Sequence, residues 1–446
     1  MQLIAQFIFG LLLLVSGYFI YKRFSFVRRN IFLGRKISIA GPSSERWGTM
    51  IRVALGQGKM FTRPIAAVMH FFIYAGFIII NIEVLEILMD GVFGTHRIFS
   101  FMGGFYHFLI GSFEVLAVLV LVACLVFLSR RNVLRIKRFW MKEMTSWPRS
   151  DANIILLFEI LLMCAFLLMN GCDYQLALRG MAEWNSEGAN ASSSLVSMFP
   201  ASSLLSPWMG DWSEHTLHLV ERTCWWFHIT GILIFIVYLT YSKHLHIILA
   251  FPNTYYSKLE PAGEFNNLSN VTREVKLMLD PSAPVEASTS EVPERFGARD
   301  VTDLSWIQLM GAYSCTECGR CTSVCPANIT GKLLSPRKIM MDTRDRLEKV
   351  GKSIDNNNGE WKDDGESLLY NHILPEELWA CTSCNACTEA CPVNINPLEI
   401  IIDLRRYLIM EESKSPESIT VMFNNIENNG APWAMSASDR ANWTKN

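Results

Sequence analysis

Long apolar stretches dominate the first 250 residues of the chain, and polar residues dominate the rest. Five of these stretches, each about 18–25 residues long, are long enough to cross a bilayer as an α-helix. We predict membrane-spanning helices at residues 3–21, 64–88, 104–128, 153–170 and 224–241. The first stretch lacks a basic start and a small-residue cleavage site, so we expect it to be an uncleaved anchor. The predicted fold class is all-α, with a five-helix transmembrane bundle at residues 1–250.

Lysine and arginine residues are distributed unevenly between the loops that join these stretches. Residues 22–63 contain ten and residues 129–152 contain seven, whereas residues 89–103 contain one and residues 171–223 contain two. Because cytoplasmic loops carry the excess of basic residues, this bias places the N-terminus outside and the polar C-terminal half in the cytoplasm. We therefore expect a multi-pass protein of a bacterial inner membrane, with the lipid bilayer as its surroundings.

The polar half divides into three segments. Residues 251–296 form a linker, which includes the Pro/Ser-rich, low-complexity stretch 281–293. Residues 297–412 are expected to form a helical, ferredoxin-like domain that holds the cysteine motifs described below. Residues 413–446 form a polar tail in which Trp433 and Trp443 have no evident core to pack into, so we expect the tail to bind a partner.

Two cysteine motifs of identical spacing lie in the 297–412 segment. Each reads C-x2-C-x2-C-x3-C-P, a pattern typical of domains with two [4Fe–4S] clusters, in which the fourth cysteine of each motif ligates the cluster of the other. Zinc ribbons are the weaker alternative, because they use cysteine pairs and four ligands per metal. Cluster thiolates also need a reducing compartment, in agreement with the cytoplasmic side. The expected ligands are Cys315, Cys318, Cys321 and Cys391 for one cluster, and Cys381, Cys384, Cys387 and Cys325 for the other.

Histidines in and beside the apolar stretches indicate haem ligands. His228 and His246 are 18 residues apart, so on one continuous helix they would share a face about 27 Å apart along the axis. His70 and His107 lie at matching depths on the second and third stretches. This arrangement predicts an inner haem b held by His70 and His246, and an outer haem b held by His107 and His228. His244 lies on another face of the same helix and is the weaker candidate. The alternative is that these rings lie at the interface without a metal, above all His107.

Carboxyl groups within apolar helices are costly, so they are candidates for function. Quinone chemistry needs proton donors and acceptors near the quinone oxygens. Glu83, Glu86 and Glu114 fall in the outer half of the predicted bundle and are candidates for handling protons, whereas Glu159 lies nearer the inner side. The alternative is that a neighbour inside the bundle satisfies each of them.

Several segments resemble known electron-transfer proteins. Residues 63–71 (RPIAAVMHF), 225–228 (WWFH) and 242–246 (SKHLH) resemble the membrane proteins of the heterodisulfide-reductase type. The two histidines of the fifth stretch also resemble those of the cytochrome b subunit of respiratory nitrate reductase. Residues 303–306 (DLSW) and 331–337 (GKLLSPR) are similar to the dicluster iron–sulfur subunit of the heterodisulfide-reductase family. The resemblance covers residues 60–412 and implies a fusion of a membrane cytochrome b with a dicluster subunit.

The sequence departs from these families at two points. The nitrate-reductase-type subunit takes two haem ligands from its second helix, whereas this chain has Ile80 where the second would lie. The outer haem therefore depends on His107. The catalytic partner in the heterodisulfide-reductase family carries Cys-Cys-Gly repeats, and this sequence has no adjacent cysteine pair. The substrate site is therefore expected on a separate subunit, of the Cys-Cys-Gly iron–sulfur type or a flavoprotein.

The resemblance implies the membrane-bound electron-transfer subunit of an oxidoreductase complex. Electrons would pass between a cytoplasmic redox partner and a membrane quinone, through two [4Fe–4S] clusters and one or two b-type haems. We expect no nucleic-acid partner. The alternative is a haem-free, membrane-anchored iron–sulfur protein that senses redox state or tethers a soluble dehydrogenase.

Overall fold

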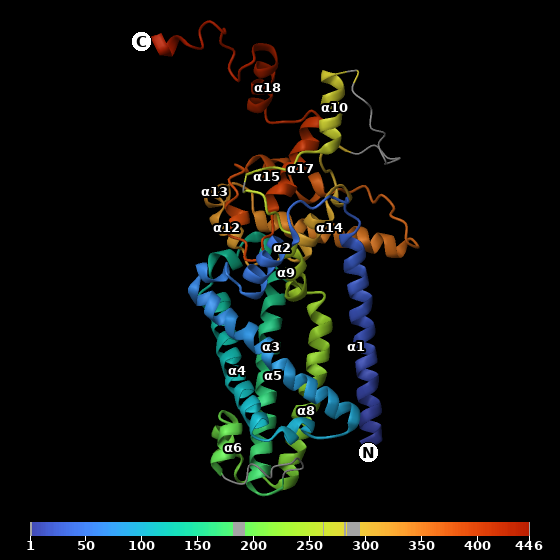
Figure 1. Ribbon diagram of the computed structural model, residues 1–446, viewed down its shortest axis with the longest axis vertical. Helices are drawn as coiled ribbons and strands as arrows, with labels where there is room; N and C mark the ends of the chain where they lie inside the picture. The colour runs from blue at the N-terminus through green and yellow to red at the C-terminus, as the bar shows by residue number, and fades with distance from the viewer. Residues whose placement is uncertain (1, 182–191, 262, 281, 283–294, 446) are drawn as a thin grey trace. The chain divides into compact units, whose positions relative to one another are not determined.

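The computed structural model describes residues 2–181, 192–261, 263–280, 282 and 295–445, and these residues are mostly helical (Figure 1). Within these ranges no strand forms, and only two isolated β-bridges occur. The all-α prediction is confirmed for this part of the chain. The low-complexity stretch 281–293 lies outside the described residues except for residue 282.

The chain divides into two compact units that do not follow a simple cut along the sequence. The first unit contains Met1–Arg28, Ile51–Phe251 and Thr316–Cys318, and the second contains Arg29–Met50, Pro252–Cys315 and Gly319–Asn446.

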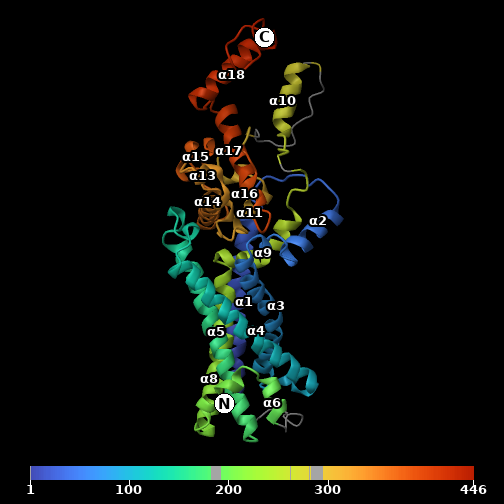
Figure 2. The ribbon, with the colours of Figure 1, turned by 90° about the vertical axis from the view of Figure 1, so that its left-hand side faces the viewer.

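Five long helices form the first unit, and each is long and apolar enough to cross a membrane. Helix α3 packs against α4, α4 against α5, and α5 against α8 (Figure 2). Large apolar side chains point outward along these helices, including Leu14 (75 % exposed) and Phe108 (68 % exposed), as expected of a lipid-facing surface. The five helices are α1 (Gln2–Ile31), α3 (Pro64–Phe93), α4 (Gly104–Leu128), α5 (Trp147–Leu178) and α8 (Glu214–Leu239).

Local sequence explains where several of these helices begin and end. Pro64 opens α3, where a missing backbone N–H costs nothing, and Gly94 ends it in the left-handed conformation. Ser213 caps α8 by accepting a hydrogen bond from the Thr216 backbone N–H. At Gly231 of α8, an added Cβ would lie 2.7 Å from Leu162 Cδ2, so α8 and α5 approach closely there.

Shorter segments connect the long helices of the first unit. They are η1 (Ile51–Leu55), η2 (Met60–Thr62), η3 (Ile98–Met102), η4 (Ser129–Val133), η5 (Lys137–Phe139), η6 (Lys142–Met144), α6 (Ser192–Met198), η7 (Ser202–Leu205), α7 (Ser206–Met209), η8 (Lys243–Leu245) and the start of α9 (His246–Tyr255).

The fifth long helix ends earlier than the sequence predicted. Helix α8 ends at Leu239, and a separate short turn, η8, precedes α9 at His246. Ser242 causes part of this break: its hydroxyl accepts from the His244 backbone N–H and donates to Asp151 Oδ2 at 3.0 Å. The prediction that His228 and His246 share one face of a continuous helix was therefore wrong, because a serine cap and a carboxylate intervene.

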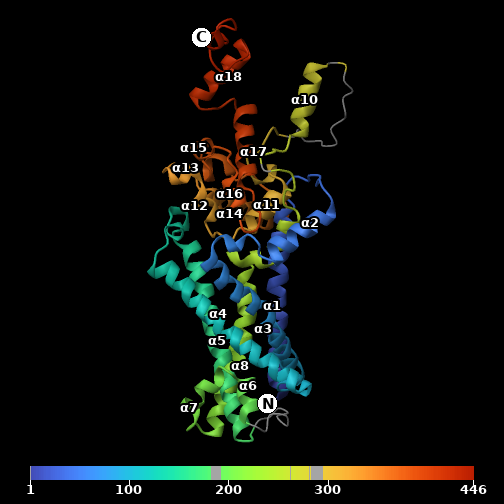
Figure 3. The ribbon, with the colours of Figure 1, turned by 60° about the vertical axis from the view of Figure 1, so that its left-hand side comes forward.

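The second unit is built around α14, which packs against α11 and α17 (Figure 3). Leu309, Ile339, Leu347, Ile400 and Leu404 are fully buried. Proline opens several of its helices, as is common at the first helical position. The helices are α2 (Ser43–Met50), α10 (Ser269–Leu279), η9 (Val301–Asp303), α11 (Trp306–Tyr313), α12 (Arg320–Val324), α13 (Pro326–Ile329), α14 (Pro336–Asn356), η10 (Leu368–His372), α15 (Pro375–Trp379), α16 (Ala386–Glu389), α17 (Pro397–Met410), α18 (Glu417–Asn429) and η11 (Asn442–Lys445).

Residues 29–50, which lie in sequence between the first two long helices, are part of the second unit. The Arg35 backbone N–H donates to the Leu304 carbonyl at 2.8 Å, and the Trp306 N–H donates to the Arg35 carbonyl at 3.2 Å. Asn30 is fully buried and donates to the Tyr313 hydroxyl at 3.0 Å. This segment is therefore anchored through its backbone to the residues that precede the first cysteine motif.

Candidate functional site: cysteine motifs, histidines and a buried carboxylate network

The two cysteine motifs have matching loop conformations. In the first motif Glu317 and Gly319 have positive φ, and in the second Ser383 and Asn385, at the same two positions, do as well. Such left-handed residues let a short loop turn tightly around a central object. The third cysteine of each motif is the second residue of a short helix: Cys321 lies in α12 and Cys387 lies in α16. These two helices pack against each other.

The structure brings together the four cysteines predicted to ligate one cluster. Cys381 lies within electrostatic range of Cys325 and Cys384, and Cys387 within range of Cys381 and Cys325. The Ser383 backbone N–H donates to Cys381 Sγ at 3.4 Å, a contact that stabilises a thiolate. Burial raises the pKa of the Cys387 thiol to about 12, so binding as thiolate requires the positive charge of a bound metal. The donor set therefore fits a cubane cluster.

The other predicted set remains an expectation from spacing and loop shape. Cys315 is buried, and Cys318, Cys321 and Cys391 are partly exposed. The Ile395 backbone N–H donates to Cys391 Sγ at 3.2 Å, which parallels the contact at Cys381.

Three histidines gather at one end of the first unit. His244 in η8 lies within electrostatic range of both His70, on α3, and His246, at the start of α9. The His244 and His246 ring centroids are 5.6 Å apart. Burial, followed by the neighbouring His246 ring and the Lys243 ammonium, lowers the pKa of His244, and burial lowers the pKa of His246. Low pKa values keep both imidazoles neutral, which is the metal-binding form. The sequence analysis ranked His244 as the weaker haem-ligand candidate, because on one continuous helix it would lie on a different face from His228 and His246.

Three of the four predicted haem ligands use Nδ1 for a hydrogen bond. His70 Nδ1 contacts Gln57 Oε1 at 2.9 Å, His228 Nδ1 contacts the Leu162 carbonyl at 3.0 Å, and His246 Nδ1 contacts the Lys243 carbonyl at 3.1 Å. A hydrogen bond from Nδ1 to a carbonyl or amide oxygen is the usual outer-shell support of a histidine that binds a metal through its other ring nitrogen. The chemistry of these donors fits a haem iron.

The predicted outer pair is less clearly assembled. His228 is fully buried, and its ring contacts Phe166 of α5 with centroids 5.9 Å apart. His107 lies in the first turn of α4 and is partly exposed. The described contacts of His228 run to α5, and none of the described contacts joins it to His107, so this pair remains a prediction.

The three predicted proton-handling glutamates belong to one buried network around Arg97. The Arg97 guanidinium donates to Asp173 Oδ2 at 2.8 Å and to Asn170 Oδ1 at 2.6 Å, and lies 3.9 Å from Glu83 Oε1. Asn170 donates in turn to Glu114 Oε1 at 3.1 Å. Arg97 is 4 % exposed and Glu83 is 3 % exposed.

A tyrosine connects the remaining glutamate to the same network. Tyr106 receives a hydrogen bond from Arg97 at 3.1 Å and donates to Glu86 Oε2 at 2.8 Å. The other Glu86 oxygen accepts from the Phe99 backbone N–H at 2.8 Å. Glu83 Oε2 is buried and has no hydrogen-bond partner among the described residues. Glu159 is not among these partners.

Sequence reasoning missed Arg97, Asp173 and Tyr106. Arg97 is the one basic residue between the second and third apolar stretches, and that isolation was the available signal. Asp173 was assigned to a loop because apolar composition ends near residue 170, whereas the α5 backbone continues to Leu178.

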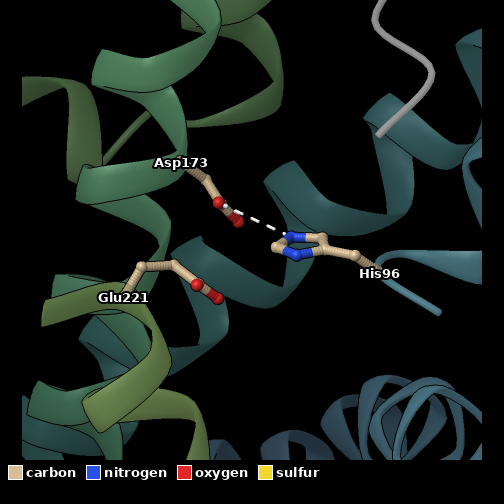
Figure 4. A group of neighbouring side chains, drawn as sticks. All are labelled: His96, Asp173 and Glu221. Carbon is tan, nitrogen blue, oxygen red and sulfur yellow. Dashed lines mark ion pairs between the residues drawn. The ribbon is translucent and has the colours of Figure 1, made fainter. Parts of the chain in front are cut away.

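His96, Asp173 and Glu221 form a compact group at the edge of this network (Figure 4). Their ligand-type atoms all lie within 4.8 Å of one another, and His96 Nε2 is 3.6 Å from Asp173 Oδ1. Arg97 binds Asp173, and Arg222 binds both Glu221 oxygens and contacts His96 Nδ1. Because two guanidinium groups already balance these carboxylates, we interpret the group as an ion-pair cluster rather than a metal site.

Comparison with known proteins identifies the cysteine region. Residues 314–395 match the model of the 4Fe-4S dicluster domain. The chain carries a 4Fe-4S dicluster domain. No solved structure matches the chain.

The chain has iron–sulfur oxidoreductase relatives. It is 27 % identical to the probable iron-sulfur-binding oxidoreductase FadF of Bacillus subtilis, over 97 % of this chain and 60 % of that protein. It is 27 % identical to the EtfAB:quinone oxidoreductase of Syntrophomonas wolfei, over 87 % of this chain and 52 % of that protein. It is also 32 % identical to one component of a ferredoxin/F420H2-dependent CoB-CoM heterodisulfide reductase of Methanosarcina acetivorans, over 23 % of this chain and 50 % of that component. The chain therefore spans about half to 60 % of the curated relatives that it matches over most of its length.

Proposed function

We propose that the chain is a membrane-bound electron-transfer subunit that links a cytoplasmic redox partner to the quinone pool. The observation that carries this proposal is the occurrence, in one chain, of a dicluster domain and five helices able to cross a membrane. The printed name of the Syntrophomonas relative, which includes a quinone, supports the membrane substrate.

The cofactors would be held by the residues described above. Two [4Fe–4S] clusters would use the eight motif cysteines, and b-type haem would use His70 and His246, with His107 and His228 as a second pair. When bound, these groups supply one-electron chemistry, and the protein contributes ligation, position and electrostatic environment. His244, beside His70 and His246, is an additional ligand candidate for the first haem.

The Arg97 network would serve the proton side of the quinone reaction. Oxidising a quinol releases two protons with its two electrons, and reducing a quinone takes them up. Glu86 and Glu114 are buried carboxyls in one hydrogen-bonded group, and the buried Glu83 joins it through its ion pair with Arg97, which suits all three to hold such protons. The basic loops favour placing this end of the bundle outside and the dicluster domain in the cytoplasm.

A cavity beside the second motif is the best candidate for partner docking. It measures about 600 Å³ and includes Trp379 and Ala380, which directly precede Cys381. Lys414, Ser415 and Pro416 of the C-terminal tail also line it. This supports the tail as a docking element for a Cys-Cys-Gly-type iron–sulfur or flavoprotein subunit.

The second candidate is a haem-free, membrane-anchored sensor or tether. The break between α8 and α9 favours it, because that break removes the common helix face that suggested two haem irons. This candidate needs the cysteines but neither His70 nor His246.

Reoxidation by quinone separates the two candidates. Purified protein reduced with dithionite and freed of excess reductant is mixed with a short-chain quinone, and its iron–sulfur and haem absorption is followed. The proposal predicts fast reoxidation and b-type haem bands, with the bands of the haem held by His70 and His246 lost in His246→Ala but retained in His215→Ala, an exposed control on α8. Haem bands unchanged in His246→Ala would refute that assignment, and absence of quinone-driven reoxidation would favour the tether.

A further inference from the structure

The buried network contains more acidic groups than basic ones. Two arginines, Arg97 and Arg222, face six carboxyl groups that are each at most 5 % exposed. Unpaired buried charge is costly, so part of this network must hold protons rather than carry six negative charges. Glu83, whose Oε2 has no hydrogen-bond partner in the part of the chain that the structure describes, is the clearest place for one. The six carboxyls belong to Glu83, Glu86, Asp90, Glu114, Asp173 and Glu221.

Protons held there need a route to water, and His96 lies at the boundary. Its Nε2 faces Asp173 Oδ1 at 3.6 Å, and 14 % of its side chain is exposed. The Arg97 guanidinium lies 3.9 Å from Glu83 Oε1 and 2.7 Å from Asp173 Oδ2, so Asp173 is a carboxylate that shares a cation with Glu83. Imidazole is the side chain whose proton affinity best suits exchange with water near neutral pH.

We propose that His96 relays protons between the carboxyls around Arg97 and the aqueous phase. The proton would move between Asp173 Oδ1 and His96 Nε2, and between His96 and water, with no net redox change. The charged groups that face His96 are Asp173 from α5, with Glu221 and Arg222 from α8. Its chain neighbour Arg97 binds Asp173 and keeps that carboxylate in place.

A second route from the carboxyls to water passes through Asp90, and we compare it with the route through His96. Asp90 Oδ1 accepts a hydrogen bond from the exposed Thr95 hydroxyl at 2.6 Å, and Asp90 Oδ2 accepts from the Arg97 backbone N–H at 2.7 Å. A hydroxyl neither gains nor loses a proton readily near neutral pH, so we expect this route to contribute little.

The relay deepens the proposed quinone role, but its test needs neither quinone nor haem, so the two can fail separately. The full chain in detergent is transferred from H₂O to D₂O, and the C=O stretching band of protonated carboxyls is followed by infrared spectroscopy. We expect His96→Gln to slow the exchange by about tenfold or more, with the wild-type rate in Thr95→Val and His215→Gln.

Chemical rescue separates a relay from a structural role. Adding free imidazole to His96→Ala should restore fast exchange, because it supplies the missing proton carrier without refolding the loop. Wild-type exchange in His96→Gln would overturn the proposal, as would slowing in Thr95→Val alone. Failure of imidazole to accelerate a folded His96→Ala protein would also overturn it.

Discussion

Arg97 is the residue on which the buried carboxyl network of the first unit depends. It bonds to Asp173, Asn170 and Tyr106 through its side chain, and to Asp90 through its backbone N–H. Guanidinium suits this position, because its planar fork of five donors serves several acceptors at once. The glutamates that the sequence suggested as separate proton carriers thus lie in one network around a shared cation.

We expect Arg97→Met to destabilise the protein by about 3–5 kcal/mol, because it leaves buried carboxylates without a counter-charge. Arg52→Met, at an exposed position, should change stability by no more than about 0.5 kcal/mol. Thermal unfolding of the two variants in the same detergent makes the comparison. Equal unfolding temperatures would show that the network does not need its arginine.

At the scale of elements, composition predicted the long helices better than it predicted their ends. The length of the apolar stretches predicted the five helices of the described residues that are able to cross a membrane, because a bilayer of fixed thickness requires a minimum apolar length. It missed the last turns of α5, which contain the polar Asp173, and the break after Leu239, where the Ser242 hydroxyl donates to Asp151. The cysteine spacing predicted its domain directly, since metal ligation leaves little freedom in the loop.

Segment 29–50 was the element that sequence reasoning placed least well. It lies between two apolar stretches, so composition gave no reason to separate it from the membrane bundle. Its attachment depends on a close backbone approach that only tertiary structure reveals. At Gly34 an added Cβ would lie 2.7 Å from the Trp306 nitrogen and 2.8 Å from the Leu304 oxygen.

Gly34→Ala should therefore destabilise the second unit by about 1–3 kcal/mol, the usual cost of overpacking. Gly17→Ala, with nothing within 4 Å of the added Cβ, is the matched control and should be neutral or slightly stabilising. Loss of visible cluster absorption on heating reports unfolding of this unit. A Gly34→Ala protein that keeps its clusters as well as Gly17→Ala would contradict the packing described for segment 29–50.

At the scale of the whole molecule, the proposal calls for two kinds of electron-carrier site. The cysteine motifs would supply soft thiolate ligands in a polar, helical unit, and the histidines would supply imidazole ligands at the helices of an apolar unit. The relatives that match most of this chain are themselves longer, since the chain spans 60 % and 52 % of their lengths.

The most direct test of the central claim is a dithionite-reduced minus oxidised optical spectrum of the purified full chain, with haem and non-haem iron counted per chain. The account predicts about eight non-haem irons, the content of two cubanes, together with the bands of at least one b-type haem. Two haems would support the His107 and His228 pair, and one would support the group around His70 and His246. Intact clusters without any haem band would contradict the proposed path through the membrane.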